Sequence, residues 1–167
     1  LYVVEAARMR DAGRTLPETL ERLMEIRSSG HIVFTMGTLD YLIHGGRIGK
    51  LKGLVASVLS LKPVVCLQEG VLHPLGVART RKQSVRRIVD GFVKYIEDNC
   101  IKLDNYIVAT GSGYDREEGL ALHEIVKAVM KEKFGYIQDM VHYQIGATIG
   151  VYTGPNPLGI GLLERAI

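Results

Sequence analysis

Two strand-like runs separated by only two residues constrain the fold more than any other feature of this sequence. Residues 62–68 form a largely apolar run with β-branched residues, and residues 71–78 indicate a second strand. Between them stands Glu69-Gly70, a pair suited to the two-residue turn of a β-hairpin. The sequence therefore predicts an antiparallel strand pair over residues 62–78, and any fold of this chain has to contain it.

Helices and further strands surround this hairpin. Capping boxes at Thr15 and Thr80, and an N-cap at Asp115, each predict the start of an amphipathic helix. Further helices are expected before Gly13 and over residues 38–44 and 51–59, and further strands over residues 31–36, 105–109, 139–145 and 158–163. Helices that alternate with strands, together with a tight hairpin, predict an α/β fold with a mainly antiparallel β-sheet flanked by helices.

Apolar stripes predict how the helices pack. The helix after Thr80 has the clearest stripe, made of Val85, Ile88, Val89, Phe92 and Ile96. The first two helices carry shorter stripes, made of Val3, Val4, Ala6 and Ala7 and of Leu16, Leu20, Leu23 and Met24. We expect residues 1–30 to lie against the main domain. Residues 139–145 alternate between apolar and polar side chains, as a half-exposed strand does.

Composition limits the partners of this protein. Its 167 residues carry a net charge of +3 at pH 7, which is too small to require a nucleic-acid partner. With Trp 0 and Phe 3, stacking platforms for single-stranded nucleic acid are scarce. Hydrophobic residues make up 47%, yet no apolar run approaches the roughly 20 residues of a membrane-spanning helix. We expect no nucleic-acid partner and no stable membrane insertion.

Motifs for metals and cofactors are missing from the sequence. The histidines at positions 31, 44, 73, 123 and 142 form no pair at metal-ligand spacing, and we expect each to be a partly exposed structural residue. Cys66 and Cys100 do not have metal-like spacing either, and free thiols predict a cytoplasmic protein. There is no Gly-x-Ser-x-Gly elbow, Walker loop or dinucleotide fingerprint. We therefore expect no metal and no cofactor.

One glycine-rich segment allows a phosphate site as an alternative interpretation. Residues 111–113, Gly-Ser-Gly, are expected to form a loop between a buried strand and a helix, where amide groups can bind a phosphate. However, Asp115, Glu117 and Glu118 crowd the same helix start and would repel an anion. We favour an ordinary strand-to-helix turn, with phosphate binding as the alternative.

Four phrases of the sequence resemble motifs of the DegV family. They are TLDYLIHGGRIGKL, LSLKPVV, EGVLHPLGVARTRKQ and GVYTGPNPLGIG, and they span residues 38–161 in the order of the family's second domain. The opening, LYVVEAARMRDAG, resembles the helix that joins the family's first domain to its second. The resemblance implies that residues 1–30 are a helical segment linking to an absent first domain. It also implies that residues 31–167 form the C-terminal lipid-binding domain of a two-domain protein.

The resemblance further implies the residues of the binding site. The family's phrase usually reads His-Thr-Gly-Pro-Gly, and its histidine helps to bind the carboxylate of a fatty acid. Tyr152 stands at the histidine position, followed by Thr153, Gly154, Pro155 and then Asn156 in place of glycine. A tyrosine hydroxyl donates one hydrogen bond but does not become positively charged as histidine does. Tyr152 and Thr153 are thus the expected carboxylate ligands, and Gly154 and Pro155 shape the turn. Alternatively, Tyr152 is a half-buried aromatic residue and Thr153 is structural.

Function also follows from the resemblance. DegV-like proteins are bacterial fatty-acid-binding proteins, and some present the bound acid to a separate fatty-acid kinase. Arg47 and Arg79 match arginines of the surface that docks this kinase, although either could be an ordinary surface residue or the partner of an acidic group. The chain is thus expected to carry a long-chain fatty acid and not to be an enzyme.

Two other functions are left open by the residues themselves. A phosphoryl-transfer or phosphate-binding enzyme would use residues 111–113 and would turn over a nucleotide. A regulatory or nucleic-acid-binding module would use the basic run Arg79, Arg81, Lys82, Arg86 and Arg87, and its binding would fall steeply with salt. A solvated helix face is the simpler explanation of that run.

Overall fold

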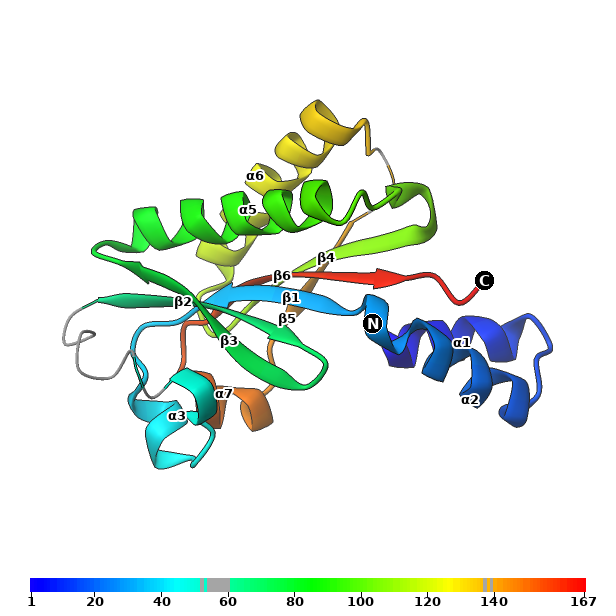
Figure 1. The fold of residues 1–167 in the computed structure, drawn as a ribbon, viewed down its shortest axis with the longest axis horizontal. Helices are drawn as coiled ribbons and strands as arrows, with labels where there is room; N and C mark the ends of the chain where they lie inside the picture. Colours follow the sequence, from blue (N-terminus) through cyan, green and yellow to red (C-terminus); the bar gives the residue numbers. More distant parts are fainter. Residues whose placement is uncertain (52, 54–60, 137, 139) are drawn as a thin grey trace.

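A six-stranded sheet forms the centre of the molecule (Figure 1). The computed structural model describes all residues except 52, 54–60, 137 and 139. The strands lie in the order β3-β2-β1-β6-β4-β5, and neighbours are antiparallel except β4 and β5, which are parallel. Their bounds are β1 (His31–Thr35), β2 (Lys62–Gln68), β3 (Val71–Ala78), β4 (Tyr106–Ser112), β5 (Val141–Gln144) and β6 (Leu158–Glu164). The predicted α/β fold with a mainly antiparallel sheet is confirmed.

Helices cover one face of the sheet and lie at both of its ends. The α-helices are α1 (Tyr2–Asp11), α2 (Leu16–Glu25), α3 (Asp40–His44), α5 (Arg81–Asp98), α6 (Arg116–Phe134) and α7 (Ala147–Thr153). Short 3-10 turns are η1 (Ile26–Ser29), η2 (Gly49–Leu51) and η3 (Leu103–Asn105). Helices α5 and α6 cover one face, α3 and α7 lie together at one end, and α1 and α2 extend beyond the other end (Figure 1). The predicted helix over residues 51–59 falls almost wholly outside the described residues.

The predicted hairpin is present with the predicted bounds. Glu69 and Gly70 connect β2 to β3, and both have positive φ values, 49° and 77°. Two positive φ values in a two-residue loop are those of a type I′ turn, whose twist matches that of the strands. Farther along, the register shifts between Val64 and Val65, so β3 carries a bulge opposite this point.

The main core lies between the sheet and its two long helices. Helix α5 contributes the stripe that the sequence predicted, with Ile88, Phe92 and Ile96 fully buried. Leu122 and Val126 of α6 join the same cluster. Because full burial of one such side chain stabilises a protein by about 1.5–3 kcal/mol, this layer fixes α5 and α6 to the sheet.

Only part of each apolar stripe predicted for the first two helices is buried. Val3 of α1 is 82% exposed, whereas Glu5 is fully buried and accepts a hydrogen bond from the main-chain nitrogen of Ala166 at 2.7 Å. The expected stripe of α2 is also largely on the surface, with Leu16 71% and Met24 72% exposed. These helices meet the rest of the domain through a small cluster, made of Met9, Ile26, Leu163 and Ala166 with Leu1 and Leu23 packed against it.

Helix α7 was not predicted from the sequence. Its residues Ala147–Thr153 include Gly150 and the β-branched Thr148, Ile149 and Val151, a composition of low helix propensity. Tertiary contacts at Tyr152, described below, stabilise a helix that local propensity does not favour. In the described part of the chain, no helix is both long enough and apolar enough to span a membrane.

Candidate functional site

Two tyrosines interlock α3 with α7 at one end of the sheet. Tyr152 of α7 lies on Gly45, where an added Cβ would stand 2.4 Å from Cδ1 of the ring. Tyr41 of α3 lies on Gly154, where an added Cβ would stand 2.7 Å from Cε2 of the ring. Both contacts therefore require glycine, and Gly154 also has a φ of 77°, which glycine adopts without strain. The expected ligand residue and the expected turn residue thus belong to one packed unit.

Arg47 stands over Tyr152 at the same corner. Gly46 has a φ of 67° and ends α3, and the main-chain nitrogen of Arg47 donates to the carbonyl of Leu42 at 2.8 Å. The guanidinium carbon lies 4.8 Å from the centre of the Tyr152 ring, within the range of a cation–π contact. A permanent positive charge therefore lies over the Tyr152 ring, although the sequence suggested separate roles for these residues.

The other two predicted polar residues have different surroundings. Thr153 is buried, and its hydroxyl donates to the carbonyl of Ile149 at 3.1 Å within α7. Arg79 is exposed where β3 leads into α5, and its main-chain nitrogen donates to Oε1 of Gln83 at 3.1 Å. Arg79 thus lies between β3 and α5, whereas Arg47 lies at the corner after α3.

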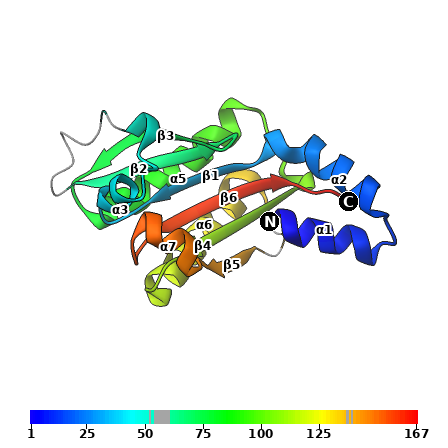
Figure 2. The same cartoon turned by 90° about the horizontal axis from the view of Figure 1, so that it is seen from below.

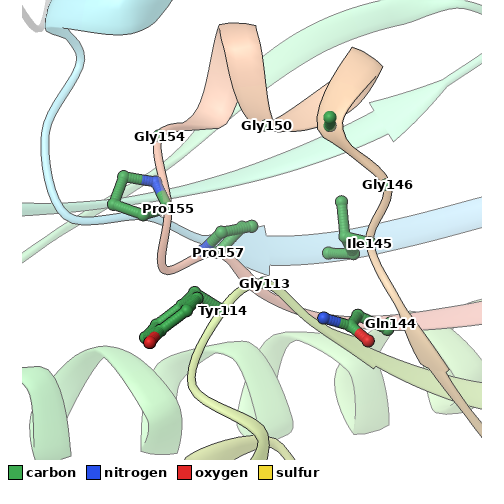
Figure 3. Close-up of a pocket in the computed structure, with 10 residues that line it drawn as sticks. Gly113, Tyr114, Gln144, Ile145, Gly146, Gly150, Gly154, Pro155 and Pro157 are labelled. Carbon is green, nitrogen blue, oxygen red and sulfur yellow. The ribbon is translucent and has the colours of Figure 1, made fainter.

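A hollow of about 210 Å³ lies beside the predicted turn (Figure 3). Pro155 and Pro157 form one side of it and Gln144 and Ile145 the other, with Tyr114 at its mouth. The remaining lining residues are Gly113, Gly146, Ala147, Gly150 and Gly154. This volume is below the roughly 300–1,000 Å³ of sites that enclose a whole small-molecule ligand. The hollow can take one end of a long ligand.

The sheet face opposite α5 and α6 has a floor of small residues. Gly159 of β6 pairs with Gly111 of β4, and Gly161 of β6 pairs with Ala109 of β4. Since alternate residues of a strand point to opposite faces, these four residues share the face that α5 and α6 leave uncovered (Figure 2). At these four positions the two strands carry no side chain larger than a methyl group. Ala109 and Gly159 are buried, and a Cβ added at Gly111 would stand 3.4 Å from the Ile145 side chain, so neighbouring residues cover part of the floor.

Bulky apolar side chains border this floor. Ile32 and Phe34 of β1 stand along one side and Val141 and Tyr143 of β5 along the other, each in register with a floor residue. Ile32 and Val141 are 40% exposed and Tyr143 is 37% exposed, so these side chains are partly open to solvent. The walls are three strand spacings apart, or about 14 Å. We call the floor and the two walls the trough.

Comparison with known families assigns the chain to one of them. The sequence model described as "Uncharacterised protein, DegV family" matches residues 1–165. The chain belongs to the DegV family. A DegV domain-containing protein of Clostridium perfringens is 30% identical over 164 residues, covering 98% of this chain and 55% of that protein. One from Clostridium acetobutylicum is 31% identical over 171 residues, with the same shares of 98% and 55%. The chain thus spans about half the length of these DegV relatives.

Solved structures of fatty-acid-binding proteins share its fold. A stearic acid-binding protein from Eubacterium ventriosum is similar with a TM-score of 0.84 at 30% identity, covering 99% of this chain and 55% of that one. A fatty-acid-binding DegV family protein from Thermus thermophilus has a TM-score of 0.81 at 26% identity, covering 98% and 55%. The fold predicted from the resemblance is therefore confirmed by both comparisons.

The sequence suggested that the glycine-rich segment 111–113 forms a loop, but most of it belongs to a strand of this DegV domain. Gly111 and Ser112 extend β4, and the amides after them are engaged: Gly113 donates to the carbonyl of Pro157 at 3.0 Å and Tyr114 to that of Pro155 at 2.7 Å. The side chain of Asp115 caps α6 by accepting from the nitrogen of Glu118 at 2.9 Å. These amides are thus committed to the protein, and the segment offers no cradle for a phosphate.

A polar cluster between β4, β5 and α6 was not predicted. The hydroxyl of Thr110 is within hydrogen-bond distance of Nδ1 of His123, 2.8 Å away, and Nδ1 of His142, 3.0 Å away. Nε2 of His142 also lies 3.1 Å from the hydroxyl of Ser112. Burial, with smaller contributions from His123 and the Arg116 guanidinium, lowers the pKa of His142. The cluster fastens β5 and α6 to β4.

Sequence spacing gave no signal for this cluster, because the parallel pairing of β5 with β4 creates it.

His31 was expected to be partly exposed, and this is wrong: it is buried and stacks on Tyr95 with 3.5 Å between ring centres. Among the described residues, no group of three or more His, Cys, Asp or Glu side chains could hold a metal ion.

Proposed function

We propose that this DegV domain supplies much of a binding site for a long-chain fatty acid. The observation that carries the proposal is the trough, where a strip of glycine and alanine lies between two apolar walls. An acyl chain would lie along this strip after a shift of the Ile145 side chain from Gly111. Burial of apolar chain there is favourable by roughly 25 cal/mol per Å². The stearic acid-binding protein of Eubacterium ventriosum and the fatty-acid-binding DegV family protein of Thermus thermophilus support this ligand class.

The carboxylate end would lie at the corner formed by α3 and α7. Gly159 of the trough floor follows Pro157 by two residues, so the trough begins where the predicted turn ends. At this corner Tyr152 can donate a hydrogen bond, while Arg47 supplies the positive charge that a tyrosine lacks. Thr153, whose hydroxyl is already bonded within α7, would act mainly by holding that helix, and Gly154 and Pro155 would shape the turn.

The site would be completed by a first domain that precedes this one. The DegV relatives are nearly twice as long as the chain, and residues 1–30 would link the two domains while residues 31–167 form the lipid-binding domain. The exposed leucines and methionine of α2 support this arrangement, since a neighbouring domain would bury them. The open side of the trough would be covered in the same way.

The protein would act as a cytoplasmic carrier and not as an enzyme, with no cofactor beside the fatty acid. It would present the carboxylate to a fatty-acid kinase, for which Arg47 and Arg79 offer exposed positive charges at two junctions of the fold. Arg47 could then serve both the ligand and the partner, whereas Arg79 would serve the partner alone. This difference makes Arg79 the cleaner position for a docking test.

Native mass spectrometry of the full-length protein tests the ligand class. We expect the protein to retain a lipid of fatty-acid mass after purification, and to lose it on delipidation and regain it with stearic acid. A protein that neither copurifies with a fatty acid nor binds added stearic acid would contradict the proposed function.

A further inference from the structure

Three successive carbonyl oxygens hold the turn after α7 in place. Those of Pro155 and Pro157 accept hydrogen bonds from the amides of Tyr114 and Gly113, and that of Asn156 accepts one from Nη2 of Arg81 at 2.8 Å. The two prolines have no amide hydrogen, so the turn cannot be fixed through bonds that they donate. Its shape therefore depends on donors that come from the start of α6 and from Arg81.

Arg81 reaches this turn while joined to α6. Its Nε and Nη2 contact the two oxygens of Glu118 at 2.7 and 2.8 Å, the two-point geometry of a guanidinium and a carboxylate. The side chains of Arg81 and Glu118 are 25% and 30% exposed, so the pair is partly shielded from water. The same Nη2 then uses its second hydrogen for Asn156. Arg81 thus links the first turn of α5, the first turn of α6 and the turn after α7.

The packing around this link leaves little room for the turn to move. An added Cβ at Gly113 would stand 2.1 Å from the carbonyl oxygen of Pro155, so the two backbones touch. Gly154, at the start of the turn, lies under the Tyr41 ring. If the Arg81 link is removed, the Asn156 carbonyl loses its protein donor and has to find one in water, which loosens the turn against this packing.

We propose that Arg81 is a positioning residue for the fatty-acid site, and not part of a basic docking surface. This proposal rests on the proposed function for the identity of the ligand. The contacts of Arg81 with Glu118 and Asn156 do not depend on that function. By holding the turn of Gly154 to Pro157, Arg81 fixes Tyr152 at one end of the trough and the wall of the hollow shown in Figure 3. Its planar fork is required, because a lysine ammonium cannot contact both carboxylate oxygens and the carbonyl in one plane.

The test compares Arg81→Lys with Arg86→Gln in the full-length protein. Arg86 is a neighbour on α5 whose only described ion pair, to Asp90 at 3.7 Å, is exposed. In Arg81→Lys we expect faster hydrogen exchange at the amides of Gly113 and Tyr114, and stearic acid that dissociates about fivefold faster, equivalent to about 1 kcal/mol. Glu118→Gln should change both measurements in the same direction, and Arg86→Gln should change neither.

The outcomes separate the two proposals. A charge-only role, as in a docking surface, would leave Arg81→Lys like wild type in both measurements, and this would overturn the positioning role. Faster amide exchange with unchanged stearic acid dissociation would overturn it too, because the turn would then be structural only. If wild type binds no stearic acid, the proposed function fails, while the exchange rates still decide whether Arg81 fixes the turn. Thermal unfolding of each variant shows that it is folded.

Discussion

The ring of Tyr152 lies directly on Gly45, and that contact joins the residue expected to bind the ligand to the corner that carries Arg47. The reverse contact of Tyr41 on Gly154 makes the joint reciprocal. Neither helix is long, and α3 has only 5 residues. Each of these short helices is therefore stabilised in part by the other, and the packing between them depends on both glycines.

Gly45→Ala should disturb this joint. The added methyl group would stand 2.4 Å from Cδ1 of Tyr152, a distance that forces the ring to move. We expect a loss of stability of about 1–3 kcal/mol in urea unfolding, together with weaker stearic acid binding. Gly37→Ala is the matched control, since an added Cβ there meets nothing within 4 Å. Equal stability of the two variants would contradict the joint.

Tyr152→Phe separates the hydroxyl of this residue from its ring. The ring makes the contacts with Gly45 and Arg47, so stability should change little. If the hydroxyl donates to the carboxylate, a hydrogen bond of about 1.5–3 kcal/mol is lost and stearic acid should bind at least about tenfold more weakly in calorimetry. Tyr152→His should keep binding and favour lower pH if the imidazole is protonated. Unchanged affinity in both variants would place the carboxylate elsewhere.

Arg79→Glu tests the docking surface. The side chain is exposed at the junction of β3 and α5, so the change should leave the fold intact. If a fatty-acid kinase docks here through acidic groups, its association should slow at low salt, and the difference should shrink as salt screens the charges. Lys127→Glu, on the exposed side of α6, makes the same change in net charge and should have a smaller effect. An equal effect of both variants would point to net charge alone.

His31 should make the stability of the protein depend on pH. Burial lowers the pKa of this imidazole to about 4, below the ordinary value of about 6.5. Between these values the unfolded chain binds a proton that the folded chain does not, so stability falls as the pH decreases from about 6.5 to about 4. The loss from this group is of the order of 3 kcal/mol and is absent above pH 6.5.

Urea unfolding as a function of pH checks this expectation. His31→Phe keeps a ring for the stack on Tyr95 and removes the titrating group, so most of the fall should disappear. The remainder should come from His142, whose pKa is also lowered. His44→Gln, at an exposed position of α3, is the control and should retain the full fall. A His31→Phe variant that loses as much stability as wild type between pH 6.5 and pH 4 would rule out this role for His31.

Local patterns predicted the elements that local physics decides. The hairpin of β2 and β3 depends on Glu69 and Gly70, and the capping boxes at Thr15 and Thr80 depend on residues three positions apart, so a short window contains all the information. The resemblance added the turn at Gly154 and Pro155. It also pointed to Tyr152, whose role in binding stays a prediction.

Features made by pairing between distant strands could not be predicted. The trough floor joins Ala109 and Gly111 of β4 to Gly159 and Gly161 of β6, and only the register shows that they are neighbours. The histidine cluster has the same origin. The stripe of α2 was misjudged for another reason: a helical pattern shows which residues are apolar, but not whether the surface that covers them lies within the same chain segment.

A floor of glycine and alanine has a consequence for selectivity. Pockets usually distinguish one acyl chain from another by a side chain that blocks the extra carbon or fills the bend of a double bond. None of the four floor residues carries such a side chain, so if an acyl chain binds along the trough as proposed, straight and kinked chains should be accepted with similar ease. Any preference must then come from the walls or from whatever covers the trough. Evolution could therefore change the preferred lipid by substituting Ile32, Phe34, Val141 or Tyr143 without altering how the sheet is built.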